Sequence, residues 1–388
     1  MIPHIFSNYL RGRKSTLLAV GPMSKNCVDA TIELSNKYNT PIMLIASRRQ
    51  IDSKYFGGGY VNNWTTEEFS KYVKKKDKKK LILLCRDHGG PWQHNLEKEK
   101  KMTTKEAMMS AKKSFSSDID AGFKIIHIDT SLSLNNTEKS KKKCLDRLFE
   151  MYEFCSNYAK KKRKKIYFEI GTEEQSGTTN TQEELEETLI KTINFCEKKK
   201  FSKPTFVVIQ SGTRVLEMRN VGTFETPFRV ENEIPAEIQV PKMIEICNKY
   251  NVLMKEHNTD YLSNEALSWH PRLGIHASNV APEFGVTETR SFINILKSNN
   301  LNELVKEFLN LSYSSKKWEK WVINKTKITK YKCSELSGHY IFSKKEFKKI
   351  KNEAQNYLVK KNIDIDKIMY TSVRSSISRY LEKFDLLR

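Results

Sequence analysis

Three of the eight histidines in this chain share one kind of position. His88, His257 and His276 each stand at the end of a short apolar run, beside carboxylates. Neutral imidazoles and carboxylates are the ligands that a divalent metal takes, with one position left open for a substrate oxygen. Alone, each histidine could equally be a hydrogen-bonded structural residue. If the run ends meet, we expect His88 and His257 to bind metal and His276 to contact substrate.

Other polar side chains follow the same kind of run. They are Arg86, Asp87, His127, Asp129, Ser131, Glu169, Glu173, Gln210, Asp260, Ser278 and Asn279. His127 and Asp129 alternate along one run, so both could point into a site or form a satisfied polar pair in the core. Lys255 could form a Schiff base, but an ion pair with a neighbouring carboxylate in the interior is the favoured interpretation.

Eight apolar runs rich in Ile, Leu, Val and Phe must position these residues. They cover residues 16–21, 41–47, 81–87, 124–130, 166–171, 205–210, 252–257 and 272–277, and helical patterns lie between them. Continuous apolar strands that alternate with helices indicate a parallel sheet covered on both faces. Eight such units over roughly 280 residues match the (β/α)8 TIM barrel, whose typical size is ~250 residues. In a barrel the strand ends converge on one mouth.

The alternative is an open doubly wound sheet, which would need a Gly-rich phosphate loop after its first strand. The turn at that point, Gly21-Pro-Met-Ser-Lys25, has no such loop. We therefore predict a barrel over residues 1–300. From residue 301 the pattern is helical and amphipathic, so residues 301–388 are expected to form a helical extension packed on the barrel.

The chain is strongly basic, with 68 Lys and Arg against 46 Asp and Glu, a net charge of +22. Much of this charge lies in lysine blocks at 74–80, 160–165 and 198–200, just before strands. Those positions belong to the bottom of a barrel, away from the active-site face. Since no aromatic residues interleave with the blocks, we expect a solvated face and no specific nucleic-acid binding.

Other features of the chain indicate the cellular compartment in which we expect the protein. No apolar run approaches the ~18–20 residues that a membrane span needs, and the first residues lack the order of a signal peptide. The seven cysteines are odd in number and contain no CxxC pair, which is typical of reduced thiols. We expect a cytoplasmic protein that does not bind membranes.

At the run ends the chain resembles the class II ketose-bisphosphate aldolases, which are metal-dependent barrels. The shared motifs are Asp87-His88-Gly89, Ile128-Asp129-Thr130-Ser131, Glu169-Ile-Gly-Thr-Glu173 and the strand that ends at His257. Over most of its length the chain is more closely similar to the tagatose-bisphosphate aldolase non-catalytic subunit family, which is related to ketose 4-epimerases. That similarity includes Gly57-Gly-Gly-Tyr60 and residues 121–129, 170–173 and 256–261.

The resemblance implies roles for particular residues. Asp87 would be the acid/base, and His88 and His257 would bind a divalent metal, Zn²⁺ first and Mn²⁺ as the alternative. The other members of the implied site are the catalytic carboxylates Glu169 and Glu173 and the substrate-binding residues Arg86, Asp129, Ser131, Asp260, His276, Ser278 and Asn279. A metal would stabilise the enediolate of aldol cleavage, while a carboxylate takes the C4-hydroxyl proton.

The chain departs from the aldolase pattern at two points. The aldolases have a third histidine after the sixth strand, where this chain has Gln210, so the third ligand is Gln210, Glu169, Glu173 or absent. Their Gly-rich phosphate loop is replaced by Asn258-Thr259-Asp260-Tyr261. A phosphate would have to rely on Arg86, Arg214, Ser278 or Asn279, so a monophosphorylated or unphosphorylated ketose, or a sugar acid, is expected.

Two hypotheses of different classes remain. The leading one is a metal-dependent aldolase or 4-epimerase that acts on a ketose or ketose phosphate. The alternative is a non-catalytic subunit that stabilises a separate catalytic aldolase subunit, and it is favoured by the missing third histidine. In both cases we expect the chain to form oligomers.

Overall fold

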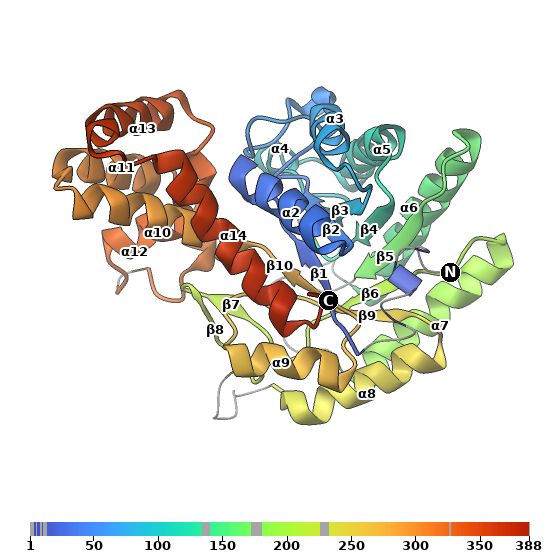
Figure 1. Cartoon of the computed structure of the whole chain (residues 1–388). Helices are drawn as coiled ribbons and strands as arrows, with labels where there is room; N and C mark the ends of the chain where they lie inside the picture. The colour runs from blue at the N-terminus through green and yellow to red at the C-terminus, as the bar shows by residue number, and fades with distance from the viewer. Residues whose placement is uncertain are drawn as a thin grey trace.

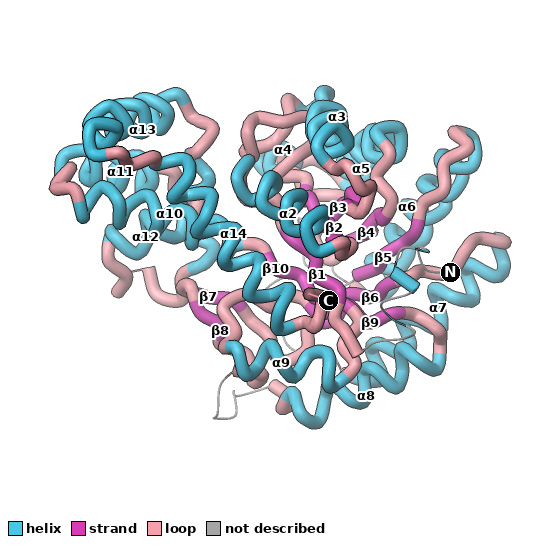
Figure 2. Tube along the Cα trace, in the orientation of Figure 1, coloured by secondary structure: helices cyan, strands magenta, loops and turns pink. Residues whose placement is uncertain are grey.

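The computed structural model describes residues 14–133, 140–171, 181–225, 233–325 and 327–387, together with residues 4, 6, 7 and 10. Eight parallel strands form a closed barrel in the order β1-β10-β9-β6-β5-β4-β3-β2. Helices surround the strands, and a group of C-terminal helices forms a lobe to one side (Figures 1 and 2). The predicted TIM barrel with C-terminal helices is confirmed.

The strands lie close to the predicted runs, with one exception. They are β1 (Leu17–Val20), β2 (Ile42–Ser47), β3 (Ile82–Gly89), β4 (Ile125–Asp129), β5 (Tyr167–Gly171), β6 (Phe206–Ile209), β9 (Leu253–Glu256) and β10 (Ala277–Val280), and a small hairpin pairs β7 (Val215–Leu216) with β8 (Arg219–Asn220). The last strand was predicted at 272–277. The strand starts later because the preceding helix continues to Leu273 and is capped by Gly274, which adopts a left-handed conformation (φ 84°).

The helices around the barrel follow the predicted alternation. They are α2 (Lys25–Tyr38), α3 (Thr66–Lys76), α4 (Asn95–Glu99), α5 (Thr104–Ala121), α6 (Lys141–Lys161), α7 (Gln182–Lys199), α8 (Ala236–Lys249), α9 (Asn264–Leu273) and α10 (Pro282–Ser298). Two begin as their sequence indicates: Thr65 and Glu68 form a capping box on α3, and Thr181 and Glu184 form one on α7. Each cap satisfies free backbone N–H groups and contributes about 1 kcal/mol.

Alternate strand residues face opposite sides of the barrel wall, as the pleat requires. Leu17 and Ala19 of β1 belong to one buried cluster with Phe206 and Ala277. Leu18 and Val20 belong instead to the large cluster that includes the surrounding helices. Side chains therefore fill the barrel interior below the mouth. The polar residues at the strand ends lie above these side chains.

The C-terminal lobe has its own apolar core before the chain returns to the barrel. Its helices are α11 (Asn302–Ser314), α12 (Lys330–Ser337), α13 (Lys345–Leu358) and α14 (Ile365–Lys383), with short 3-10 turns at Glu319–Trp321, Gly338–Ile341 and Val359–Lys361. Phe292, Phe308 and Phe347 are among the residues of the lobe's core. Near the end of α14, Tyr380 and then Phe384 join the core of the barrel, so α14 connects the two (Figure 1).

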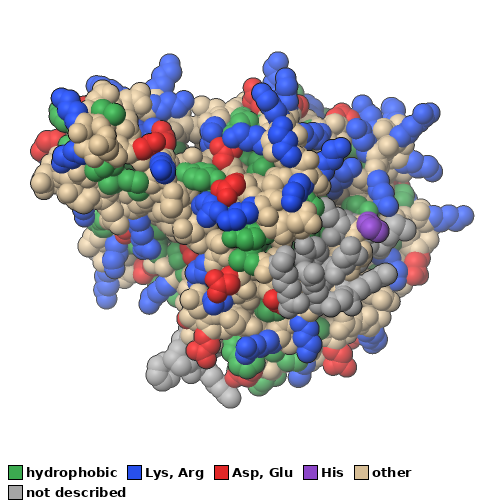
Figure 3. All heavy atoms as spheres, viewed as in Figure 1, with side chains coloured by type: hydrophobic (Ala, Val, Ile, Leu, Met, Phe, Trp, Pro, Cys, Tyr) green, Lys and Arg blue, Asp and Glu red, His purple; other side chains and the backbone are tan. Residues whose placement is uncertain are grey.

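The surface of the molecule is rich in cations. Lys and Arg side chains spread over the face shown in Figure 3, with fewer carboxylates among them. Among the described residues, no helix is long and apolar enough to cross a membrane.

Glu288 of α10 is a buried carboxyl between the barrel and the lobe. Its side chain is 2% exposed; Oε1 accepts a hydrogen bond from Asn26 Nδ2 at 2.8 Å, and Oε2 has no hydrogen-bond partner among the described residues. Burial raises the pKa of Glu288 from 4.5 to about 7. In the pH window between these values the folded protein holds a proton that the unfolded chain releases, so stability falls as the pH rises, by about 3 kcal/mol.

Replacement of Glu288 by Gln is expected to remove this pH dependence. Glu288→Gln should raise the thermal midpoint near pH 8 and leave it almost unchanged near pH 4.5, because Gln resembles the protonated acid. Glu346→Gln on the exposed face of α13 is the matched control. Equal shifts for both variants, or no shift near pH 8, would contradict the assignment of this group.

Candidate metal and substrate site

A cavity of about 300 Å³ opens at the carboxyl-terminal mouth of the barrel. Its inner wall carries Asp87 and His88 at the end of β3, His257 and Asp260 in the loop after β9, and Asn279 of β10. Residues of the C-terminal lobe cover the outer wall, notably Lys316, Lys317, Glu319, Lys320, Trp321 and Tyr340. The site is therefore built by both parts of the chain.

The end of β3 is distorted in a way that directs two neighbouring side chains into the cavity. The register with β4 shifts between Arg86 and Gly89, which is typical of a β-bulge. His88 has a left-handed backbone (φ 43°), uncommon for a residue with a side chain. A Cβ on Gly90 would lie 2.0 Å from the carbonyl oxygen of Asp129, so only glycine fits beside β4.

Two imidazoles face each other across the cavity floor. His88 Nε2 and His257 Nε2 lie 3.3 Å apart, and the two side chains come from opposite sides of the barrel. His88 Nδ1 contacts Asp129 Oδ2 at 2.5 Å, which fixes the orientation of the ring. Carboxylates that hold the distal nitrogen of a histidine in this way are common behind metal ligands.

Asp129 is itself held by its neighbours. Gln93 Nε2 donates to Asp129 Oδ2 at 2.8 Å, while Ser131 Oγ donates to Oδ1 at 2.6 Å. Asp129 and Ser131 were expected to contact substrate. The structure places them behind His88, outside the cavity lining.

The pKa values of the two imidazoles are shifted in opposite directions. Burial would lower the pKa of His88, but Asp87 and Asp129 outweigh it and raise the pKa above the ordinary value. Burial, reinforced by the charge on His88, lowers the pKa of His257 to about 3. His88 therefore holds a proton more readily than His257, and a metal that binds both imidazoles must displace any proton between them.

Asp87, His88 and His127 form a group whose potential ligand atoms lie within 4.8 Å of one another. Asp87 Oδ1 lies 3.3 Å from His127 Nδ1, and Asp87 Oδ2 lies 3.7 Å from His88 Nε2. Although burial opposes it, the charges of His88 and His127 lower the pKa of Asp87 below its usual range. An ionised carboxylate among imidazoles is a donor set that fits a divalent cation.

Glu169 lies beside this group and neutralises a buried lysine. His127 and Glu169 are register partners in β4 and β5, and His127 Nδ1 lies 3.5 Å from Glu169 Oε1. Lys255 Nζ lies 2.7 Å from Glu169 Oε2, and both side chains are about 1% exposed. The expected interior ion pair of Lys255 is confirmed. Glu169 Oε1 and His127 Nε2 have no hydrogen-bond partner among the described residues.

Several residues expected at the site lie elsewhere. Arg86 points away from the barrel interior, forms a buried ion pair with Asp118 of α5 and donates to the carbonyl oxygens of Ala46 and Ile51. Its neighbour Asp87 faces the cavity, and successive strand residues alternate, so Arg86 must face the helices. Because β10 begins after His276, this histidine lies at the bottom, where Nδ1 accepts from the Met254 amide at 3.1 Å.

Gln210 and Ser278 also lie outside the cavity lining. Gln210 Nε2 donates to the carbonyl oxygen of Thr213, and its Oε1 accepts from Asn258 Nδ2 at 3.2 Å. The Oγ of Ser278 is buried in β10 without a hydrogen-bond partner among the described residues. Glu173 falls outside the described residues.

Asp260 and Asn279 do line the cavity, as expected. Asp260 Oδ1 accepts from the backbone amides of Ala281 and Glu283, each at 2.9 Å. Burial and the nearby Glu283 raise the pKa of Asp260 to about 8. Asn279 is 5% exposed, and neither polar atom of its side chain has a hydrogen-bond partner among the described residues. Both can therefore bind a polar ligand.

Arg49, Gln93 and the lysines of the lobe were not expected at the site from the sequence. His127 was left open between core and site, and only its alternation with Asp129 pointed to the site. Nothing in the local pattern around Lys316–Lys320 indicates that this segment lines a cavity with residues as distant in the chain as Asp87.

The fold and the site together define a (β/α)8 barrel protein with a histidine and carboxylate group at its mouth. A model of the D-tagatose-1,6-bisphosphate aldolase subunit GatZ/KbaZ-like family matches residues 2–286. The chain belongs to this family, and the resemblance noted from its motifs is confirmed. No curated protein sequence matches the chain.

Solved structures share the fold at low sequence identity. A probable tagatose 6 phosphate kinase from Sinorhizobium meliloti 1021 is 15% identical with a TM-score of 0.76, covering 95% of this chain and 100% of its own. Fructuronate-tagaturonate epimerase UxaE from Cohnella laeviribosi is 10% identical with a TM-score of 0.62, covering 96% of this chain and 82% of its own. A putative fructose-1,6-biphosphate aldolase from Coccidioides immitis is 10% identical (TM-score 0.53; 96% and 92%).

Proposed function

We propose that this chain is a divalent-metal-dependent enzyme that performs aldol or retro-aldol chemistry on a ketose or ketose phosphate. Cleavage would give an aldolase; recombination of the fragments within the site would give a 4-epimerase. The observation that carries the proposal is the pair His88 and His257, with facing nitrogens 3.3 Å apart beside the ionised Asp87 in one cavity.

In this proposal His88 and His257 bind the metal, and His127 supplies the third donor in place of Gln210. His127 belongs to the group with Asp87 and His88, whereas the amide of Gln210 is engaged by its own loop. Imidazole ligands suit Zn²⁺ better than Mn²⁺, and Mn²⁺ is the alternative. When bound, the metal supplies Lewis-acid stabilisation of negative charge on the substrate.

Asp87 acts as the acid/base. Its carboxylate lines the cavity and is ionised, so it can accept the C4-hydroxyl proton of a ketose as the C3–C4 bond breaks. His127 Nδ1, 3.3 Å from Asp87 Oδ1, positions that carboxylate. Glu169, which forms an ion pair with Lys255, contributes to the electrostatic environment of the site. Asn279 and Asp260 line the cavity and would bind sugar hydroxyls.

The second candidate function is a stabilising subunit of a catalytic aldolase. The position after β6 offers no imidazole, and Gln210 faces its loop. The family model also describes its members as subunits. In that case the mouth would retain the fold of an aldolase site without turnover.

The two functions are separated by an NMR screen of the Zn²⁺-loaded and Mn²⁺-loaded protein against ketoses, ketose phosphates and ketouronates. The enzyme predicts cleavage or C4 epimerisation of one substrate class, abolished by chelation. If the loaded protein turns over none of them but increases the activity or stability of a separate aldolase, the subunit function replaces the proposed one.

A further inference from the structure

Positively charged side chains line the outer end of the cavity. Four cationic side chains line it, namely Arg49 of the loop after β2 and Lys316, Lys317 and Lys320 of the segment that leads from α11. None of the four is within ion-pair distance of a carboxylate among the described residues. Glu319, the acid nearest them in sequence, pairs with Lys325 at 3.2 Å.

The carboxylates of the inner wall do not balance this charge. The Asp87 carboxylate interacts with the imidazoles instead: its oxygens lie 3.3 Å from His127 Nδ1 and 3.7 Å from His88 Nε2. Asp260, with its pKa raised to about 8, is mostly neutral at pH 7. The cavity therefore has an imidazole end and a cationic end.

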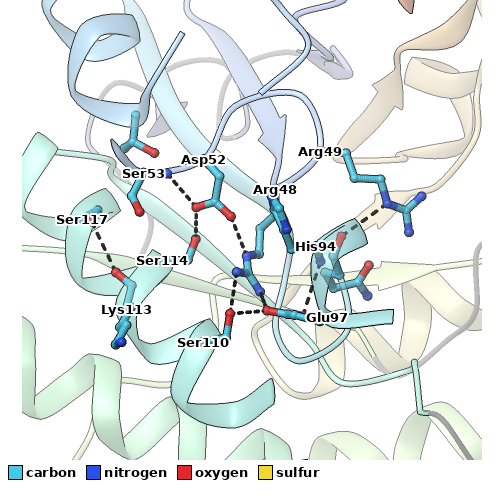
Figure 4. A network of polar contacts seen from close by, with 12 residues as sticks. Arg48, Arg49, Asp52, Ser53, His94, Glu97, Ser110, Lys113, Ser114 and Ser117 are labelled. Atoms are coloured by element: carbon cyan, nitrogen blue, oxygen red, sulfur yellow. Dashed lines mark hydrogen bonds and ion pairs between the residues drawn. The ribbon is translucent and has the colours of Figure 1, made fainter. Parts of the chain in front are cut away.

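Arg49 is held in place by a buried network under its loop. The preceding residue, Arg48, is fully buried and pairs with Asp52 at 2.9 Å and with Glu97 at 2.6 Å. Figure 4 shows this network on one side and Arg49 turned to the other, where its Nε donates to the carbonyl oxygen of Gln93 at 3.3 Å. The terminal nitrogens of Arg49 have no hydrogen bond to a described residue.

Lys320 is held by aromatic side chains. Its Nζ lies 4.2 Å from the ring centre of Trp321 and 5.8 Å from that of Tyr340, and Trp321 Nε1 donates to Tyr340 Oη at 3.2 Å. The Lys320 side chain is exposed to solvent at the cavity, which it lines. Desolvation by the groups around it, with the charges of Arg49 and Lys317, lowers the pKa of Lys320 well below its ordinary value. An anion would relieve the repulsion.

We infer that Arg49, Lys316, Lys317 and Lys320 form a subsite for a phosphate group of the ligand, at the cavity end opposite the imidazoles. A dianionic phosphate matches several cations, and an Arg guanidinium can bind it with two hydrogen bonds. The inference rests on the proposed function in one respect only, because that function identifies the part of the ligand that binds near the imidazoles. It excludes Arg86, which the sequence had suggested for this task and which is buried against Asp118.

The subsite makes the C-terminal lobe part of the recognition of the ligand. Three of the four cations come from the lobe, and only Arg49 comes from the barrel. The phosphate would therefore be bound by side chains across the junction, in place of the backbone amides of a Gly-rich loop.

The test is calorimetric titration of inorganic phosphate into the full-length, metal-free protein, with acetate as a parallel probe. Phosphate is expected to bind more tightly than acetate. Arg49→Gln and Lys320→Gln should each weaken phosphate binding at least about tenfold, since each removes a charge-assisted contact. Because Lys316 and Lys317 are exposed, a double Gln variant there should weaken binding without disturbing packing.

Lys330→Gln on α12 is the control, since it removes the same charge from the lobe outside the cavity. Unchanged phosphate affinity in all cavity variants, an equal loss in Lys330→Gln, or acetate binding as tight as phosphate would each overturn the subsite. Zn²⁺ binding is measured in a separate titration of the same metal-free preparations. A wild-type protein that binds phosphate but no Zn²⁺ would reject the proposed function and leave the subsite standing.

Discussion

Replacement of His88 by alanine is expected to weaken metal binding at least about a hundredfold and to remove turnover. His88 faces His257 at 3.3 Å, belongs to the group with Asp87 and His127, and is oriented by Asp129 at 2.5 Å. Loss of an outer partner of a ligand typically costs 10–100-fold in metal affinity, and loss of the ligand costs more. The measurement is Zn²⁺ affinity by competition with a chelator.

Two further variants make this result specific. Gln210→Ala should retain wild-type metal affinity, because its amide is bound by Thr213 and Asn258. His127→Ala should weaken the affinity. Since His88→Ala leaves Asp129 buried without its partner, His88→Gln serves as a second variant and circular dichroism confirms the fold. Wild-type affinity in both His88 variants, or a loss confined to Gln210→Ala, would contradict the ligand assignment.

Replacement of Asp87 by Asn is expected to separate metal binding from turnover. Asn has nearly the shape of Asp but cannot accept the substrate proton, so kcat should fall by about 10²–10⁴-fold. Metal affinity should stay within about tenfold of wild type, because the imidazoles remain. The measurements are the rate of ketose cleavage or epimerisation and the metal content of the same preparation.

The outcomes for this variant assign the role of Asp87 uniquely. Retained turnover would remove Asp87 as the acid/base. Complete loss of metal would instead make Asp87 a ligand, as its place in the group with His88 and His127 allows. Glu67→Gln on the exposed start of α3 is a suitable control for the loss of one carboxylate.

The fold could be predicted from the sequence because each barrel unit carries a local signal. Apolar runs gave seven strands to within about two residues, and the Thr-x-x-Glu motifs gave the starts of α3 and α7. The eighth strand was misplaced because Leu273 and Ile275, on either side of Gly274, resemble a strand in the sequence, although Leu273 ends α9 and β10 begins only at Ala277. This error moved His276 to the wrong end of the barrel.

The imidazole end of the cavity could be predicted only in part from the sequence. Convergence of Asp87, His88 and His257 follows from barrel topology, because strand ends share one mouth whatever their separation. Arg86 was assigned to the same mouth although strand alternation turns it toward Asp118. The bulge at His88, which breaks that alternation and brings two neighbours inward, has no distinct local signal.

The cationic end of the cavity could not be predicted from the sequence. Lys316 and Lys320 reach the mouth only because the lobe docks on the barrel through α14, whose far end packs with the barrel core. Long-range docking of this kind depends on the summed burial of many side chains. No spacing of residues in the segment itself reveals it.

The proposed function depends on one cation bound between His88 and His257. Anomalous diffraction at the zinc edge, from crystals of the full chain grown with Zn²⁺, would locate that cation. A single strong anomalous peak is expected about 2.0–2.1 Å from a nitrogen of each imidazole. A well-ordered mouth with no peak there, or a peak only on surface residues, would contradict it.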